Sequence, residues 1–345
     1  MKRNKNNIFL LIGLVAVVIA FTGIASAMFA QSTSDFLFMS YNVENLFDTI
    51  DNPQKNDNEF LPSAKREWNS YRYQKKLTNI SKVIVAAAQN WHNPDVIGLC
   101  EVENDTCLRD LLHRTNLYKL HYNYIHYDSE DARGIDVALL YNEETFKPLM
   151  HSPLRVVFDD KNRKTRDILY VSGIMTATKD TVHIFECHFP SRRGGQDVSE
   201  QYRMVVAQCV RMHIDSLFAK NPNAYVIVSG DFNDYPDDRS IVEGLQAKKV
   251  GTDCEQCLLS LEDKKAEGTY KFQGQWNFLD QAMVSNRFLK DYSVEYAVLQ
   301  NDFLLDRSAK TGETTPRRTY QGTFYKGGIS DHLPIIVSFK KQVVR

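Results

Sequence analysis

Short apolar runs alternate with polar segments along the chain, and they predict buried β-strands. Each run is only a few residues long and is rich in β-branched or aromatic side chains, which favours a strand over a helix. The runs are Phe36–Met39, Val96–Leu99, Val137–Leu140, Val182–Cys187, Tyr225–Val228 and Leu333–Val337.

Two other segments repeat their apolar residues with the period of a helix. The residues that would share a face are Leu77, Ile80, Ile84 and Ala87 in the first segment, and Val206, Val210, His213 and Leu217 in the second. Strands interleaved with a few helices predict a layered α/β or α+β architecture. Because no linker-like or repetitive segment interrupts the chain after residue 31, we expect a single domain over residues 34–340.

Polar residues flank the apolar runs in a consistent order. They follow the earlier runs directly, whereas near the C-terminus they precede them. The end of one strand and the start of an antiparallel neighbour lie at the same edge of a sheet, so these side chains are expected to converge. The set is Asn42, Glu101, His188, Asp231, Asn233, Asp280, Asp331 and His332.

A pocket lined by this set can hold a divalent cation. Carboxylate and amide oxygens suit Mg²⁺ or Mn²⁺, which usually retain several of their water ligands. A zinc site would require more His or Cys at close spacing. Each motif alone has a plainer explanation as a turn or as the exposed end of a strand. Their joint occurrence indicates an active site.

The motifs resemble, in order, those of the endonuclease/exonuclease/phosphatase superfamily, and the chain looks like an exported bacterial-type member. The matching segments are 40–45, 98–102, 134–138, 187–191, 230–234, 279–281 and 330–334, within residues 38–337. The resemblance implies an α+β fold, a four-layer α/β/β/α sandwich with two mostly antiparallel sheets packed face to face. It also implies hydrolysis of a phosphate ester.

The resemblance assigns three residues to the metal. Glu101 matches the glutamate that binds it, and Asn42 and Asp331 match residues that help hold the ion or its waters. The expected ion is Mg²⁺ or Mn²⁺, which would neutralise the charge that builds up at phosphorus.

Five further residues match catalytic groups. Asp231 and Asn233 match the pair that positions the attacking water and the phosphate. His332 matches a histidine oriented by an aspartate, here Asp280, and His188 matches a second histidine that faces the phosphate. Either Asp231 or the His332–Asp280 pair could accept the proton of the water, and the sequence leaves that choice open.

Two arginines are candidates for binding the substrate phosphate through their fork-like donors. Arg133 precedes the 134–138 motif, and Arg192 follows the histidine strand. Asp136 stands where many relatives carry a small residue, so no role is assigned to it. The polar stretch over residues 301–329 is expected to be a loop near the site.

The N-terminus predicts export. A basic start, Met1–Lys5, is followed by the apolar run Ile8–Ala20 and by Ala25–Ala27, a cleavage site of the A-x-A type. Residues 1–30 are therefore expected to be a signal peptide of a secreted or periplasmic protein. An uncleaved membrane anchor is the alternative, since Ile8–Ala30 is long enough to span a bilayer.

Cysteine chemistry does not explain the function. Cys254 and Cys257 form a CxxC in loop-like surroundings, which suits a local disulfide. Cys100, Cys187 and Cys209 lie in apolar runs and are expected to be buried small hydrophobic residues.

The net charge limits the type of substrate. The formal value is -1, and about -4 without the basic start, which argues against a protein that coats nucleic acid by charge alone. A nucleic acid, a generic phosphodiester and a small phosphomonoester all stay open as substrates of a monomeric enzyme. A non-catalytic binding module is disfavoured because the residues that such a module would lose are present.

A phospholipid-headgroup hydrolase of the sphingomyelinase type is the alternative enzyme. It would need exposed aromatic residues that dock on a membrane. We expect the protein to contact a membrane only through a lipid substrate or through an uncleaved N-terminal segment. The candidates are Trp68, Tyr71, Tyr73 and Trp276.

Overall fold

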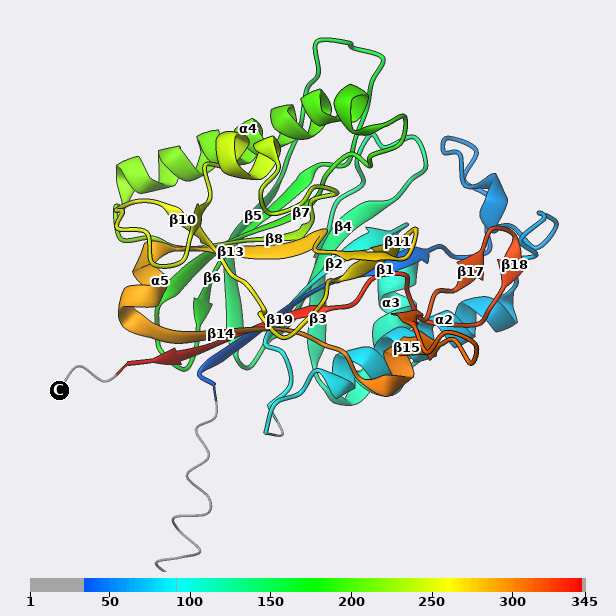
Figure 1. Ribbon diagram of the computed structural model, residues 1–345. Coiled ribbons are helices and arrows are strands. Elements are labelled where there is room, and N and C mark those ends of the chain that lie inside the picture. The colour runs from blue at the N-terminus through cyan, green and yellow to red at the C-terminus, as the bar shows by residue number, and fades with distance from the viewer. Residues whose placement is uncertain (1–33, 91, 343–345) are drawn as a thin grey trace, which may run out of the picture.

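Two large β-sheets pack face to face and helices cover their outer faces in the computed structural model (Figure 1). The structure describes residues 34–90 and 92–342, so the predicted signal peptide lies outside the described residues. The architecture is the predicted α+β sandwich of four layers. In the described part of the chain, no helix has both the length and the apolar character needed to cross a membrane.

The first sheet contains the N-terminal and C-terminal strands side by side. Its strands, in spatial order, are β14 (Tyr292–Val298), β19 (Ile335–Lys341), β1 (Phe36–Leu46), β2 (Val96–Val102), β4 (Asp136–Asn142) and β3 (Tyr122–His126). β1 and β2 are parallel, and the other neighbours are antiparallel. The last strand, β19, is therefore internal to this sheet.

The second sheet is built in the same mostly antiparallel way. Its strands, in spatial order, are β5 (Phe146–Leu154), β6 (Ile168–Met175), β7 (Thr181–His188), β8 (Tyr225–Asp231), β13 (Asp280–Ser285), β10 (Leu258–Ser260) and β9 (Lys248–Lys249). The pairs β7–β8 and β9–β10 are parallel, and the rest are antiparallel.

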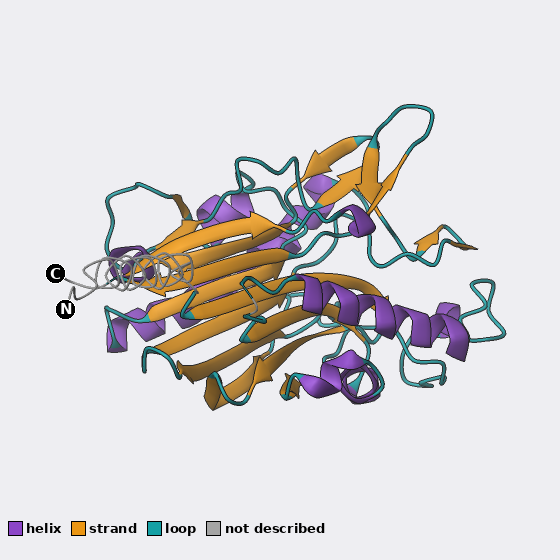
Figure 2. Cartoon of the chain, turned by 90° about the horizontal axis from the view of Figure 1, so that it is seen from below, coloured by secondary structure: helices purple, strands orange, loops and turns teal. Residues whose placement is uncertain are grey.

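The outer layers are helical. Helices α2 (Ser70–Ala86) and α3 (Asp105–His113) cover the first sheet, as the view from below shows (Figure 2). Helix α4 (Gln196–Lys220) covers the second sheet together with η3 (Ser240–Gly244), and α5 (Asn286–Asp291) precedes β14.

Both predicted helices are present, and one buried face differs from the expectation. Val206 and Val210 of α4 are buried, but the face continues through Ile214 and Phe218. His213 and Leu217 are only partly buried. The residues that enter the core are spaced by four, slightly more than one helical turn, so the buried face drifts around the helix axis.

The predicted strands are confirmed, with one shift at the C-terminus. The last strand begins at Ile335 and not at Leu333. Pro334 has no backbone N–H to donate to a neighbouring strand, which accounts for the late start.

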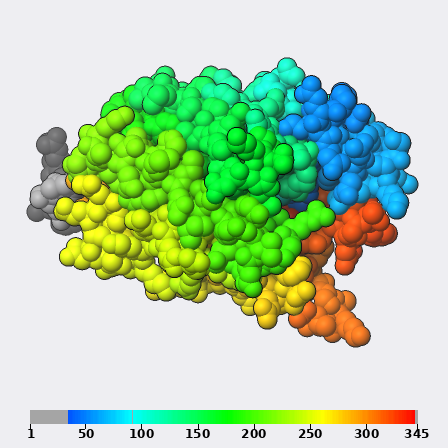
Figure 3. Space-filling model, turned by 90° about the horizontal axis from the view of Figure 1, so that it is seen from above, coloured from blue at the N-terminus to red at the C-terminus, as the bar shows by residue number. Residues whose placement is uncertain are grey.

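The polar stretch over residues 301–329 is more structured than the expected loop. It contains the short helix η4 (Asp302–Leu304), the hairpin β15–β16 (Leu305–Arg307, Thr314–Pro316) and the hairpin β17–β18 (Tyr320–Gln321, Phe324–Tyr325). These hairpins, orange to red, project at one end of the molecule beside the blue segment that follows β1 (Figure 3). The remaining elements are η1 (Asn58–Phe60), η2 (Asn116–Lys119) and the hairpin β11–β12 (Tyr270–Phe272, Gln275–Asn277).

The cysteines agree with the sequence analysis except at one position. Cys254 and Cys257 form the expected disulfide. Cys100 and Cys187 are fully buried, whereas Cys209 on α4 is partly exposed.

One carboxyl group lies in the core between the two sheets. Glu186 on β7 is fully buried, and the hydroxyls of Ser40 on β1 (2.7 Å) and Ser229 on β8 (2.5 Å) donate to it. Gly98 on β2 leaves the necessary space, because a Cβ there would lie 2.1 Å from atoms of the Glu186 carboxyl group. Burial raises the pKa of Glu186 from 4.5 to about 7.

This buried acid makes the stability of the protein depend on pH. As the pH rises, Glu186 loses its proton at a lower pH in the unfolded chain than in the folded protein. The fold is therefore most stable, with respect to this group, below about pH 4.5, and this stability is lost as the pH rises to about 7. The loss amounts to roughly 3 kcal/mol. Glu186→Gln keeps a neutral, hydrogen-bonding side chain, and we expect it to reduce the pH dependence of stability by about the contribution of Glu186.

Guanidinium unfolding at roughly pH 5 and pH 8 measures the effect as a change in the free energy of unfolding between the two conditions. Glu144→Gln, a change at an exposed glutamate, is the matched control. An equal pH dependence in the wild type and in Glu186→Gln would contradict the assignment.

Candidate active site

Three neighbouring strands of the second sheet end with polar residues side by side. In the register of this sheet, Asp231 at the end of β8 lies opposite His188 at the end of β7. Asp231 also lies opposite Asp280 at the start of β13. The predicted strand order therefore brings these three residues to one edge, as the reversal in the sequence implied.

The end of β8 and the residues just after it fix Asp231 and Asn233. Gly230 in β8 has a φ of +127°, and a Cβ at this position would lie 1.9 Å from the carbonyl oxygen of Cys187 on the neighbouring strand. Only glycine fits there. Beyond the strand, the backbone N–H of Asn233 donates to Asp231 Oδ1 (2.9 Å), and Asn233 Nδ2 donates to the carbonyl oxygen of Phe189 (3.0 Å).

Glu101 reaches the site through an irregularity in β2. Its φ is +67°, and the pairing of β2 with β4 shifts between Cys100 and Val102. A bulge of this kind changes the direction of a side chain at a sheet edge. The carboxylate is held by the backbone N–H of Asn45, which donates to Glu101 Oε2 (2.8 Å).

The Ser330–His332 segment is tied to the first sheet before it enters β19. The Ser330 hydroxyl donates to the carbonyl oxygen of Asn42 (2.7 Å), and the backbone N–H of His332 donates to Ser330 Oγ (3.1 Å). His332 Nδ1 lies 2.7 Å from Asp280 Oδ2 and donates to it, because a carboxylate can only accept. The ring of Tyr270 packs on the His332 ring, with centroids 4.7 Å apart.

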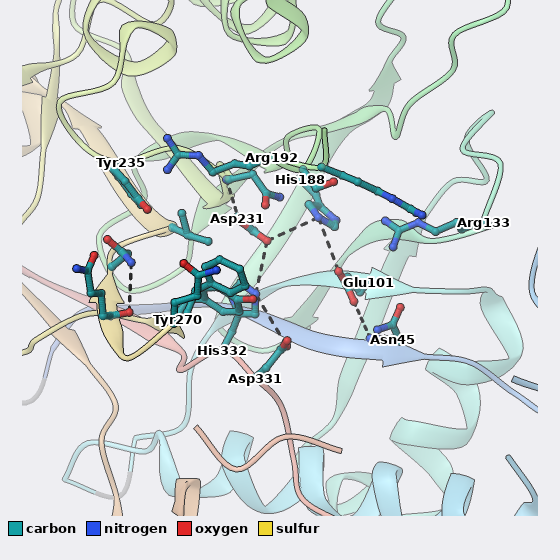
Figure 4. A pocket seen from close by; sticks show the side chains of 18 residues that line it. Asn45, Glu101, Arg133, His188, Arg192, Asp231, Tyr235, Tyr270, Asp331 and His332 are labelled. Atoms are coloured by element: carbon teal, nitrogen blue, oxygen red, sulfur yellow. Dashed lines mark hydrogen bonds and ion pairs between the residues drawn. The ribbon is translucent and has the colours of Figure 1, made fainter. Parts of the chain in front are cut away.

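These side chains line a cavity of about 680 Å³ (Figure 4). Of the ten residues predicted from the sequence, eight line it: Glu101, Arg133, His188, Arg192, Asp231, Asn233, Asp331 and His332. Asn42 and Asp280 do not line the cavity and are each 1% exposed. Asn42 Nδ2 donates to Asp231 Oδ2 (2.9 Å), and Asp280 bonds to His332 (2.7 Å), so each acts on the pocket through a residue that lines it.

The surroundings of the two histidines shift their pKa values in opposite directions. Burial lowers the pKa of His188 well below its usual value, and the charges of Arg166, Arg133 and His332 act in the same direction. For His332 burial also opposes the charged form, but the carboxylates of Asp280 and Asp231 outweigh it and raise its pKa well above the usual value. At neutral pH, His188 is therefore neutral and His332 is cationic.

Asp231 lies between these two rings, as the dashed lines in Figure 4 indicate. Its Oδ2 is 3.6 Å from His188 Nε2 and 3.9 Å from His332 Nε2. Burial raises the pKa of Asp231 to about 7, an effect that the His332 charge opposes and the Asp280 charge reinforces. A carboxylate with this pKa exchanges a proton easily near neutral pH.

Two groups of residues have the composition of a metal site here. Asp231, Asp280 and His332 place ligand atoms within 4.8 Å of one another. In this group the Asp280–His332 hydrogen bond already occupies two of the atoms. The carboxylates of Glu101 and Asp331 both line the cavity and have side chains 14% and 23% exposed, so they fit a hydrated Mg²⁺ or Mn²⁺ ion better.

The two predicted phosphate-binding arginines differ in their contacts. Arg133 is 45% exposed and has one distant carboxylate, Asp131, at 3.9 Å. Arg192 contacts Asp238 at 3.2 Å and stacks on Tyr235, with its guanidinium carbon 4.0 Å from the ring centroid. Arg133 is thus freer to bind an anion.

The structure adds residues that the sequence analysis missed. The hairpin β11–β12 forms one wall through Tyr270, Phe272, Gln273, Gln275 and Asn277. Gly274, with a φ of +84°, was a detectable signal of its turn. Nothing in the sequence linked this hairpin to the site.

Two of the four aromatic candidates for membrane docking are internal, and a third, Trp276 on β12, is partly buried. Trp68 is fully buried and Tyr73 is 5% exposed, so both pack in the core and cannot dock. Tyr71 is 73% exposed, but it does not line the cavity. Phe272, at the cavity wall, is 58% exposed and was not among the candidates.

The fold and the pocket lined by acids and histidines agree with the class of enzymes that comprises endonucleases, exonucleases and phosphatases. The family model described as "Endonuclease/Exonuclease/phosphatase family" matches residues 38–341, and the chain belongs to this family. No curated protein matches the chain in sequence.

Several solved structures share the fold at low sequence identity. Truncated TDP2 of Caenorhabditis elegans is 16% identical with a TM-score of 0.55, and the match covers 88% of this chain and 97% of that one. The human Nocturnin catalytic domain with bound sulfate is 18% identical (TM-score 0.54; 90% and 96% covered). The mannosyl-6-phosphatase of Bacteroides thetaiotaomicron is 17% identical (TM-score 0.54; 88% and 99% covered).

Proposed function

We propose that the protein hydrolyses a phosphate ester by attack of water at phosphorus, with Mg²⁺ or Mn²⁺ as the cofactor. The observation that carries this proposal is the position of Asp231 between a neutral and a cationic histidine, at 3.6 and 3.9 Å. This arrangement combines a proton acceptor with a cationic donor for a phosphate oxygen.

In the proposed mechanism, Asp231 accepts the proton of the attacking water. Asn233, fixed by its hydrogen bond to the Phe189 carbonyl, helps orient the water and the phosphate. His332 donates to a phosphate oxygen, and Asp280 keeps its ring oriented and charged. His188 is a neutral donor or acceptor on the opposite side of Asp231.

Glu101 and Asp331 would hold the metal ion, and Asn42 would support them by orienting Asp231. The ion supplies electrostatic stabilisation of the charge that develops on the phosphate and the leaving oxygen. Arg133 is proposed to bind a non-reacting phosphate oxygen, because its guanidinium group lines the cavity and is 45% exposed.

The ester is proposed to be a phosphodiester, which includes nucleic acids, or a phosphomonoester. One neighbour named a phosphatase for a mannosyl phosphate makes a sugar phosphate one candidate. A lipid headgroup is the second candidate, favoured by Phe272 at the cavity wall with 58% of its surface exposed. The same ring could equally stack on a nucleobase.

We also propose that residues 1–30 direct export and that the mature protein acts as a monomer in the periplasm or outside the cell. The Cys254–Cys257 disulfide supports an oxidising compartment.

The proposal is tested by assays with Mg²⁺, Mn²⁺ or EDTA against plasmid DNA, a chromogenic phosphodiester, a chromogenic phosphomonoester and sphingomyelin. We expect hydrolysis of at least one substrate with metal and its loss in EDTA, with recovery when metal is restored. Hydrolysis that persists in EDTA would rule out the metal-dependent mechanism, and inactivity toward all four would count against the proposed substrate classes.

A further inference from the structure

A second group of metal-ligand side chains lies at the base of the loop formed by residues 127–135. His126 is the last residue of β3, Asp136 is the first residue of β4, and Asp128 lies within the loop. One ligand atom of each residue lies within 4.8 Å of those of the other two.

The His126 ring is nearly inaccessible and points at an acid without bonding to it. Its side chain is 4% exposed, and its Nε2 atom is buried and has no hydrogen-bond partner. This atom is 3.7 Å from Asp136 Oδ2, whose side chain is 3% exposed. A buried ring nitrogen without a partner is costly unless something else binds it.

The separation of these two atoms suits two ligands of one ion. Two donors about 2.1 Å from a tetrahedral ion lie roughly 3.4 Å apart, which is close to the observed spacing. The cluster also carries uncompensated negative charge. Across residues 34–90 and 92–342, neither Asp128 nor Asp136 forms an ion pair with a lysine or arginine.

We propose that His126, Asp128 and Asp136 form a second divalent-metal site, separate from the catalytic pocket. The cluster has fewer nitrogen ligands than a structural zinc site, but one imidazole nitrogen beside two carboxylate oxygens still suits Zn²⁺ better than Mg²⁺ or Ca²⁺, which prefer oxygen ligands alone. The exposed side of Asp128 gives the ion a path from solvent and leaves room for a water ligand. This gives Asp136 a role that the sequence analysis could not assign.

The ion would close the base of a loop that reaches the active site. Within the loop, Arg133 lines the catalytic cavity, and Asp131 forms an ion pair with Arg166 at 3.2 Å. Lys55 Nζ donates to the carbonyl oxygens of Ser129 (2.7 Å) and Asp131 (2.9 Å). With both ends of the loop bound to one ion, the Arg133 backbone is held in position for the substrate.

Metal binding can be measured without any activity. The double variant Glu101→Gln/Asp331→Asn, stripped of metal, removes the proposed catalytic ligands. Because Asp231, Asp280 and His332 remain, the site at the cluster is the one whose Zn²⁺ binding the cluster changes described below weaken. We expect isothermal titration with ZnCl₂ to give one strong site in this background, and a thermal midpoint that rises with Zn²⁺. MgCl₂ and CaCl₂ should bind there much more weakly.

Added changes at the cluster then identify the ligands. Asp128→Asn should weaken Zn²⁺ binding by at least about tenfold and abolish the thermal shift, since even an outer partner of a ligand is typically worth that much. His126→Gln should have a larger effect. Glu130→Gln, an exposed acid of the same loop paired with Arg155 and Lys164, is the matched control and should bind Zn²⁺ normally.

Absence of a strong Zn²⁺ site in the background variant would overturn the proposal, as would binding that neither cluster change weakens. In either case His126 and Asp136 would be buried neighbours that bind no metal. If His126→Gln does not fold, the exposed Asp128→Asn still decides the question. Because the readout is binding, failure here leaves the proposed hydrolysis untouched, and the reverse also holds.

Discussion

Asp231→Asn is expected to lower kcat by about 10³-fold, the usual order for loss of a positioned proton acceptor. Asparagine is nearly isosteric, so the side chain keeps its place between the two histidines, but it cannot accept the proton of a water. The change acts on a step after substrate binding, so KM should change much less than kcat.

The folded state should tolerate this substitution. Asp231 accepts one hydrogen bond from Asn42 and one from the Asn233 backbone, and an asparagine keeps one of the two. Against the lost hydrogen bond stands the removal of a buried carboxylate, whose pKa is raised to about 7 by burial. The two effects oppose each other, and we expect only a small change in Tm.

Steady-state kinetics and thermal denaturation on the same samples test both expectations. Asp237→Asn is the matched control, because Asp237 lies six residues after Asp231, its side chain is 79% exposed and it pairs with Lys249 at 3.3 Å. Its kcat should equal that of the wild type. A folded Asp231→Asn protein with nearly normal kcat would exclude Asp231 as the proton acceptor.

Asp280→Asn is expected to lower kcat by roughly 10²-fold through its effect on His332. Asp280 lies 2.7 Å from His332 Nδ1 and is 1% exposed, so it does not touch the substrate and is a positioning residue. Its charge is the main influence that raises the pKa of His332 against burial. Without that charge, His332 loses its proton at a lower pH.

Two measurements separate positioning from a purely structural effect. In Asp280→Asn the alkaline limb of the kcat–pH profile should move to lower pH, because the cationic His332 is the active form. A double-mutant cycle with His332→Ala should be strongly non-additive, with Asp280→Asn adding little once the ring is absent. An unmoved alkaline limb together with additive effects would refute the proposed role of Asp280.

Much of the fold follows from local patterns in the sequence. The apolar runs became β1, β2, β4, β7, β8 and β19 because short β-branched stretches are stable only when paired and buried. Strands without such an apolar run were not predicted. β5, for example, buries only Phe146 and contains Pro148 and Pro153, so its position at a sheet edge depends on β6 as a neighbour.

The sequence by itself determined which chemical groups meet. Residues at the ends and starts of strands have fixed positions relative to the sheet edge, so His188, Asp231 and Asp280 are brought together once those strands pair. Tertiary structure decided what each group can do. Asn42 and Asp280 lie behind the pocket wall, and Glu101 reaches it through a bulge. The opposite protonation of the two histidines depends on burial and on charges from strands far apart in the chain, which no local pattern encodes.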